Sequence, residues 1–180
     1  MVNRPIRPAI RVAVAVPFVI YLVLLLKLIL FKMPPDTILM FLQNWRPEDI
    51  GRNVNLVPFV TIRQFVEAYR YGYLNENIIL ENLLGNMVCL IPWGISLPIL
   101  FVGRRRWRSF LPATLLFILG IETVQLVTGL GIFDVDDILL NMIGAVAGFA
   151  MWRVWDRIQM KIREKNLNCP AVQPSVSRMP

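Results

Sequence analysis

Long runs of apolar residues dominate the chain, and short polar stretches or one long connection separate them. Each run holds about 20 residues, the length that an α-helix needs to cross the hydrocarbon core of a bilayer. The pattern predicts an all-α integral membrane protein with a single domain over residues 1–155 and a polar tail over residues 156–180. Its four transmembrane helices are expected at about 10–31, 78–102, 110–129 and 138–155.

The first run follows a basic segment, as both an uncleaved span and a cleaved signal peptide would. No small-residue cleavage site follows it, because the chain continues as Phe31-Lys-Met-Pro-Pro35. We therefore interpret the run as a membrane span. Lys27 falls within a turn of its far end, where a lysine side chain can extend to the membrane interface.

Two other local patterns refine the predicted elements. Pro92-Trp-Gly94 lies inside the second run, so we expect a kink there. In the long connection, residues 32–77, the stretch from Thr61 to Tyr71 carries apolar residues at helical spacing. This spacing predicts a short amphipathic helix on the membrane surface or over the mouth of the bundle.

The positive charge of the chain indicates its orientation. Lys and Arg are in excess before the first run, in the turn 103–108 and in the tail, but not in the connection 32–77 or the turn 130–137. Four spans place the basic segments on one side, which should be the cytoplasm. The termini are then cytoplasmic, the amphipathic helix is extracellular, and the last dozen residues of the basic tail are expected to be disordered.

The amino-acid composition limits the kinds of site that the protein can contain. Hydrophobic residues make up 56% of the chain, and topology accounts for the net charge of +7 better than nucleic acid binding does. The chain has no histidine, which excludes Ser-His catalysis and His-ligated zinc. Cys89 lies in an apolar run and Cys169 in the tail, so no disulfide is expected. We predict no metal site and no cofactor, although carboxylate and amide oxygens also suit a hard divalent cation.

Polar side chains inside the last three spans fall at one depth, in the outer half of the membrane. Glu122 and Gln125 share one helix face, and Asp137 shares another with Asn141. Amides can simply hold helices together, and Asp134 can simply cap the last helix. A carboxylate well below the interface costs about 2.5–3.5 kcal/mol and usually marks a functional site. We therefore predict an outward-facing acidic and amide-lined cavity.

Several motifs occur in a fixed order between residues 50 and 155: Asn55-Leu-Val-Pro58-Phe59, Asn82-Leu-Leu-Gly-Asn86, Ile91-Pro-Trp-Gly94, Glu122-Thr-Val-Gln125 and Phe133-Asp-Val-Asp-Asp-Ile-Leu-Leu-Asn141. Together they resemble the VanZ-like family of bacterial membrane proteins, which is named for a protein that gives low-level resistance to the glycopeptide teicoplanin. The resemblance implies a small multi-pass protein of the bacterial plasma membrane with no established enzymatic reaction. The family often has an arginine where this chain reads Gly129-Leu-Gly131-Ile, and Phe where it has Leu90.

The leading hypothesis is a membrane protein that binds a cell-envelope lipid or a lipid-linked ligand, such as a lipoglycopeptide or a lipid-linked cell-wall precursor. By resemblance, the effect would be teicoplanin resistance. Membrane lipids are the other expected partners, and nucleic acid is not one. The candidate ligand-binding residues are Glu122, Gln125, Asp134, Asp137, Asn141, Asn82, Asn86 and, through the family motif, Asn55.

Two alternatives stay open. An intramembrane enzyme acting on an envelope lipid or peptidoglycan precursor could use Glu122 with Asp134 or Asp137 as acid and base, but the catalytic residues are unknown. A structural subunit could instead assemble through the small residues Gly144 and Gly148, including as a homo-oligomer.

Overall fold

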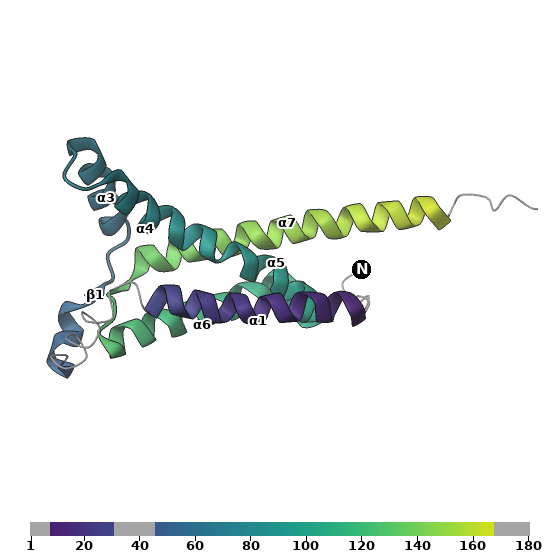
Figure 1. Cartoon of the computed structure of the whole chain (residues 1–180), viewed down its shortest axis with the longest axis horizontal. Helices are drawn as coiled ribbons and strands as arrows, with labels where there is room; N and C mark the ends of the chain where they lie inside the picture. The colour runs from purple at the N-terminus through teal and green to yellow at the C-terminus, as the bar shows by residue number, and fades with distance from the viewer. Residues whose placement is uncertain (1–7, 31–45, 168–180) are drawn as a thin grey trace, which may run out of the picture.

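A computed structural model describes residues 8–30 and 46–167 of the chain. Its long helices run side by side, and Figure 1 shows α3 and β1 at one end of the bundle, while the last turns of α7 project beyond the other. The helices are α1 (Pro8–Leu30), η1 (Pro47–Arg52), α3 (Val60–Tyr71), α4 (Glu76–Cys89), α5 (Ile91–Leu100), η2 (Val102–Arg104), α6 (Trp107–Thr128) and α7 (Val135–Leu167). The strands are β1 (Val54–Asn55) and β2 (Phe133–Asp134).

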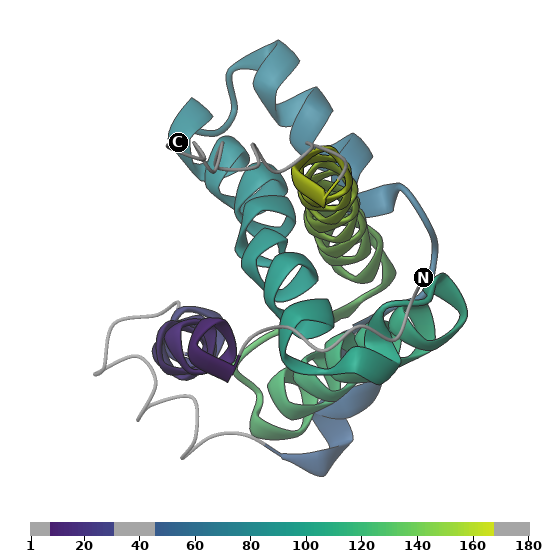
Figure 2. The same ribbon diagram turned by 90° about the vertical axis from the view of Figure 1, so that its right-hand side faces the viewer.

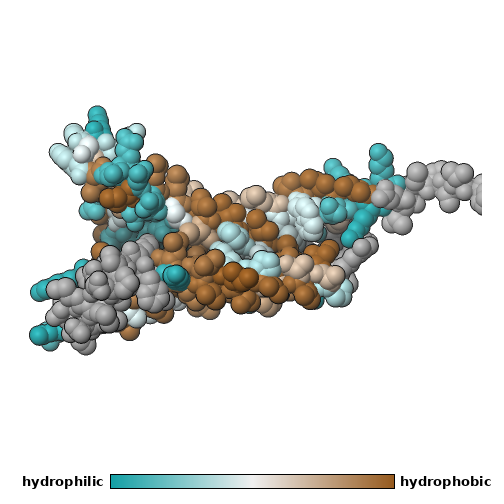
Figure 3. All heavy atoms as spheres, in the orientation of Figure 1, coloured by the Kyte–Doolittle hydropathy of each residue, from teal (hydrophilic) through white to brown (hydrophobic). Residues whose placement is uncertain are grey.

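Four helical segments are long and apolar enough to cross a membrane. Figure 3 shows apolar side chains over the middle of the molecule and hydrophilic ones gathered toward its two ends. The expectation of a helical, multi-pass membrane protein is therefore confirmed. The four segments are Pro8–Leu28, Glu76–Leu100, Trp107–Thr128 and Val135–Lys165.

The second span is broken where the sequence predicts a kink. Helix α4 ends at Cys89 and α5 begins at Ile91, with Pro92 in the first turn of α5. Proline fits a first turn because its missing N–H has no partner to lose there. The last carbonyls of a helix need partners from outside it. The Tyr21 hydroxyl of α1 supplies one, because it donates to the Cys89 carbonyl oxygen over 2.7 Å.

The four spans begin two or three residues before the expected positions, and two other boundaries also differ. The amphipathic stretch forms α3, as predicted, and begins one residue earlier than expected, at Val60. The last helix, α7, continues to Leu167, 12 residues beyond the expected end of the span at Trp155. The polar segment stays helical because Lys, Arg, Glu, Gln and Met are good helix formers. The disorder expected for the last dozen residues falls outside the described residues.

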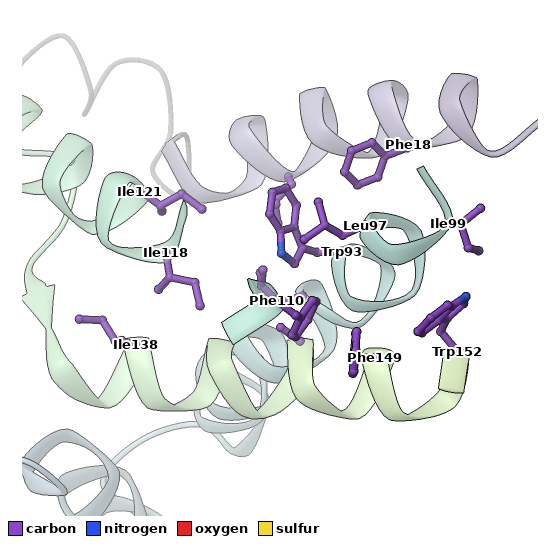
Figure 4. Close-up of a cluster of buried hydrophobic side chains, with 13 residues drawn as sticks. Phe18, Trp93, Leu97, Ile99, Phe110, Ile118, Ile121, Ile138, Phe149 and Trp152 are labelled. Carbon is purple, nitrogen blue, oxygen red and sulfur yellow. The ribbon is translucent and has the colours of Figure 1, made fainter. Parts of the chain in front are cut away.

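Helix α5 lies at the centre of the bundle, between α1 and α7 (Figure 2). Aromatic rings fill the space around it. The rings of Trp93 and Phe117 are stacked at 3.9 Å, and those of Phe110 and Phe149 at 4.2 Å. Figure 4 shows this cluster along the inner face of α7. The Trp93 indole N–H donates to the Thr114 hydroxyl over 3.2 Å, so its polar atom is paired inside the core.

Small residues bring the backbones of α7 and the broken span into contact. A Cβ atom on Gly144 would collide with the Met87 carbonyl, one on Gly148 with the Ile91 carbonyl, and one on Gly94 with the Ala145 carbonyl. The predicted small-residue stripe on the last helix thus serves close packing, as expected. Its partner is a helix of the same chain. Both glycines are buried within one molecule, and the oligomer interface expected through them stays a prediction.

Candidate functional site

A two-residue parallel ladder joins the long connection to the start of α7. Val54 pairs with Phe133 and Asn55 with Asp134, and the Phe133 N–H donates to the Asn53 carbonyl oxygen over 2.9 Å. The ladder therefore brings two distant parts of the sequence together. We call this end of the bundle, with β1, β2 and the first turn of α7, the strand end (Figure 1).

Asp134 is the most highly connected side chain at the strand end, and it is 6% exposed. One of its oxygens accepts from the Asn55 amide over 3.1 Å and from the Asp136 N–H over 2.9 Å. The other accepts from the Thr61 hydroxyl over 2.5 Å. The bond to Asp136 caps the first turn of α7, so the predicted capping role of Asp134 is confirmed. The other two bonds hold the connection against α7.

Asp136 caps a different helix, and sequence reasoning did not select it. Its side chain is completely buried. One oxygen accepts from the Phe59 N–H over 2.5 Å and the other from the Ile62 N–H over 3.1 Å. These N–H groups belong to the start of α3, where the helix has no internal acceptors. An acid on α7 thus fixes the position and the entry of α3.

Glu122 lies on α6 beneath the strands and is only 1% exposed. One of its carboxylate oxygens accepts from the backbone N–H of Asp134 over 3.3 Å. Gln125, one turn further along α6, is 6% exposed and packs against Gly131. A Cβ atom on Gly131 would lie 3.1 Å from the Gln125 side chain. Gly131 is therefore closed in by the Gln125 side chain.

A second polar contact ties α4 to α7. The Asn86 amide donates to a carboxylate oxygen of Asp137 over 2.5 Å. Asn141 lies one turn below Asp137 and is also buried. Asn82 does not take part in this contact, because its amide donates to the Ile78 carbonyl of its own helix over 2.7 Å. Asn82 and Asn86 lie on one face of α4, but their side chains have different hydrogen-bond partners.

Five of the eight predicted site residues fall into two groups. Asn55, Asp134 and Glu122 belong to a network that also includes Thr61 and Asp136, whereas Asn86 and Asp137 form a bridge between two helices. No group of three or more acidic or thiol side chains in the described residues could hold a metal ion. An open cavity between the two groups stays a prediction.

The sequence placed Asp136 in the Phe133–Asn141 motif without predicting a role for it, and nothing in the sequence pointed to Thr61. Thr61 stands at the start of an amphipathic stretch, where a hydroxyl is unremarkable. Asp136 looks like an ordinary acidic residue in a helix's first turn. Their roles depend on the β1–β2 ladder, and a ladder of two residues leaves no pattern in the sequence.

Comparison with protein-family models matches residues 18–156 to the family described as VanZ/LLP1. The matched range contains every predicted site residue. It also contains the four candidate spans, apart from the first turns of α1 and the last turns of α7. No curated protein and no solved structure matched the chain.

Proposed function

The chain belongs to the VanZ/LLP1 family, and we propose that it binds a cell-envelope lipid or lipid-linked ligand at the strand end of its helix bundle. The protein for which the family is named is linked to teicoplanin resistance. For this chain we propose the same kind of effect, reduced sensitivity to a lipoglycopeptide. The strand end would face outward from a bacterial plasma membrane.

The burial of Glu122 carries this proposal. Its carboxylate is 1% exposed and sits within a helix that could cross the membrane. Placing an ionisable side chain there costs about 2.5–3.5 kcal/mol on insertion scales, and such residues commonly belong to ligand or ion sites. Packing alone would be served better by an apolar residue of similar size.

The charge distribution supports the proposed orientation. Away from the strand end, most arginines and lysines lie in two places. These are the turn 103–108 and the last turns of α7. Both lie at the opposite end of the bundle, together with the start of α1 (Figure 1). We call this the basic end. Basic segments stay in the cytoplasm, so the termini would be cytoplasmic and the strand end extracellular.

The residues at the strand end divide by role. Asp134 and Asp136 hold β1 and α3 in place through backbone and side-chain donors. Glu122 and Asp137 would then supply negative charge to a ligand, and Asn86 and Gln125 amide donors and acceptors. This set suits hydroxyl groups of a sugar or a primary ammonium group, both of which lipid-linked cell-wall precursors carry.

The test compares two carboxylates of the proposed site, the buried Glu122 and the half-buried Asp137, with an exposed one. Glu122→Gln and Asp137→Asn keep shape and remove charge, and Glu81→Gln makes the same change at an exposed position of α4. Each variant is expressed in a teicoplanin-susceptible bacterium and also purified into nanodiscs containing a lipid-linked cell-wall precursor. We expect the first two to lose protection and precursor binding, and Glu81→Gln to keep both. Full retention of protection and precursor binding by both Glu122→Gln and Asp137→Asn, at normal expression, would refute the proposal.

One observation favours a second candidate, a structural subunit of a membrane complex. Most of the strand-end hydrogen bonds serve to hold the chain's own segments together. In that case Glu122→Gln would lower the melting temperature without changing precursor binding. Turnover of a labelled precursor by the purified protein, lost in Glu122→Gln, would instead indicate an enzyme.

A further inference from the structure

A buried arginine organises the basic end. Arg105 follows η2 and is 6% exposed. Its Nε donates to the Pro98 carbonyl oxygen over 2.9 Å, which caps the C-terminal turn of α5. The centre of its guanidinium lies 6.0 Å from the centre of the Trp152 ring on α7, at the edge of cation–π distance. One cation thus joins α5 to α7.

The Trp152 indole carries a donor that its surroundings do not use. The residue is 3% exposed, and its Nε1 is buried with no hydrogen-bond acceptor among the described residues. Figure 4 shows this nitrogen turned away from Phe149, at the edge of the aromatic cluster. Buried indole N–H groups are normally paired, so this one requires an explanation.

A second such donor lies nearby on α1. The Nε of Arg11 is also buried and has no acceptor among the described residues. Burial lowers the pKa of Arg105, the charge of Asp156 raises it, and the charge of Arg11 lowers it. Arg11 and Asp156 are therefore both within electrostatic reach of Arg105. Two guanidinium groups and one carboxylate leave this point positively charged.

We propose that Arg11, Arg105 and Trp152 form a binding site for a phosphate group, and that the headgroup of an anionic phospholipid supplies it. Arg11 lies in the first turn of a candidate membrane span, and the end of a span that crosses a bilayer lies close to the phospholipid phosphates. Guanidinium groups suit phosphate oxygens, and an indole N–H adds a directed donor. The exposed Arg104, Arg106 and Arg108 of the adjacent turn raise the local concentration of anionic lipid. This site does not depend on the proposed strand-end function.

The sharpest test removes one N–H group. Trp152→Phe deletes the indole donor and keeps an aromatic ring, and Trp155→Phe makes the same change at an exposed position of the same helix. Arg11→Gln removes the charge of the second donor, and Arg70→Gln makes the same change at an exposed position of α3, away from this site. Native mass spectrometry of the full chain in detergent measures retained phosphatidylglycerol against phosphatidylcholine, with and without added inorganic phosphate.

We expect the unaltered chain to retain phosphatidylglycerol in preference to phosphatidylcholine. Trp152→Phe and Arg11→Gln should each weaken this retention about tenfold, as expected for the loss of a hydrogen bond to a charged group, and the two controls should match the unaltered chain. Displacement of the lipid by millimolar inorganic phosphate would support a phosphate site whose natural source is free phosphate. Equal retention of the two lipids, or equal behaviour of Trp152→Phe and Trp155→Phe, would overturn the site. If Arg11→Gln does not fold, the comparison of Trp152→Phe with Trp155→Phe still tests the proposed site.

Discussion

Asn55 donates a hydrogen bond to Asp134 over 3.1 Å, although the two residues are 79 positions apart in the sequence. The contact makes the strand end a joint between the long connection and the two last spans. The same joint includes the buried Glu122. A change in the position of α3 would therefore alter the surroundings of the Glu122 carboxylate, which is proposed to contact a ligand.

The first prediction concerns Asp136. Asp136→Ala removes the acceptor of the Phe59 and Ile62 N–H groups and leaves the start of α3 without a cap. We expect a loss of about 1–2 kcal/mol in the free energy of local opening. Hydrogen exchange at residues 59–63 measures it. Glu48→Ala, at an exposed position of η1, is the control. Unchanged exchange at residues 59–63 would show that Asp136 does not anchor α3.

The second prediction concerns the bridge between α4 and α7. A double-mutant cycle on Asn86→Ala and Asp137→Ala isolates the energy of their hydrogen bond from the cost of each truncation. We expect a coupling of about 0.6 kcal/mol and at most about 1.7 kcal/mol, the mean and the maximum from double-mutant cycles on interhelical hydrogen bonds in a membrane protein. Reversible unfolding in mixed micelles gives the four stabilities. Strictly additive effects would mean that the two side chains do not interact in the membrane.

The third prediction compares two glycines. A methyl group on Gly148 would collide with the Ile91 carbonyl, whereas one on Gly120 would meet open space on α6. Gly148→Ala should therefore destabilise the bundle by about 1–3 kcal/mol, because α5 and α7 must separate. Gly120→Ala should be neutral or stabilising by up to about 1 kcal/mol, since alanine favours a helix. Thermal unfolding in one detergent tests both, and equal melting temperatures would contradict the close approach of α5 and α7.

The fourth prediction concerns Phe59. It has a φ of 67°, the only positive φ of a non-glycine residue among those described. A left-handed conformation costs such a residue about 1–2 kcal/mol, and asparagine tolerates it better. Phe59→Asn should stabilise the detergent-solubilised protein by about 1 kcal/mol. Leu56→Asn changes a similarly exposed residue of the same loop without relieving strain. A melting temperature lowered equally by both variants would show that apolar contacts matter more here than backbone strain.

The sequence predicted features that depend on local periodicity or length. The four spans, the break at Pro92 and the amphipathic helix α3 all follow from such patterns. The cap at Asp134 and the close approach at Gly144 also follow from local residue types.

Features set by distant contacts escaped prediction. Asn82 and Asn86 share a helix face, yet only Asn86 reaches a neighbouring helix. Asp136 differs from Asp137 by one position, which turns its carboxylate toward α3 instead of α4. The rotation of α7 decides which element each of the two adjacent acids faces, and rotation is fixed by packing against other elements. Spacing within one segment cannot reveal it.

The bond from Tyr21 to the Cys89 carbonyl also bears on the order of assembly in the cell. The two residues are 68 positions apart, and α1 contacts the rest of the bundle mainly through α5. Because a chain is made from its N-terminus, α1 leaves the ribosome several seconds before its docking surface exists, at about 5–20 residues per second. During that interval it must persist in the bilayer as a solitary helix, which the uncharged stretch between Arg11 and Lys27 allows. Membrane insertion of this protein therefore precedes the packing of its first helix.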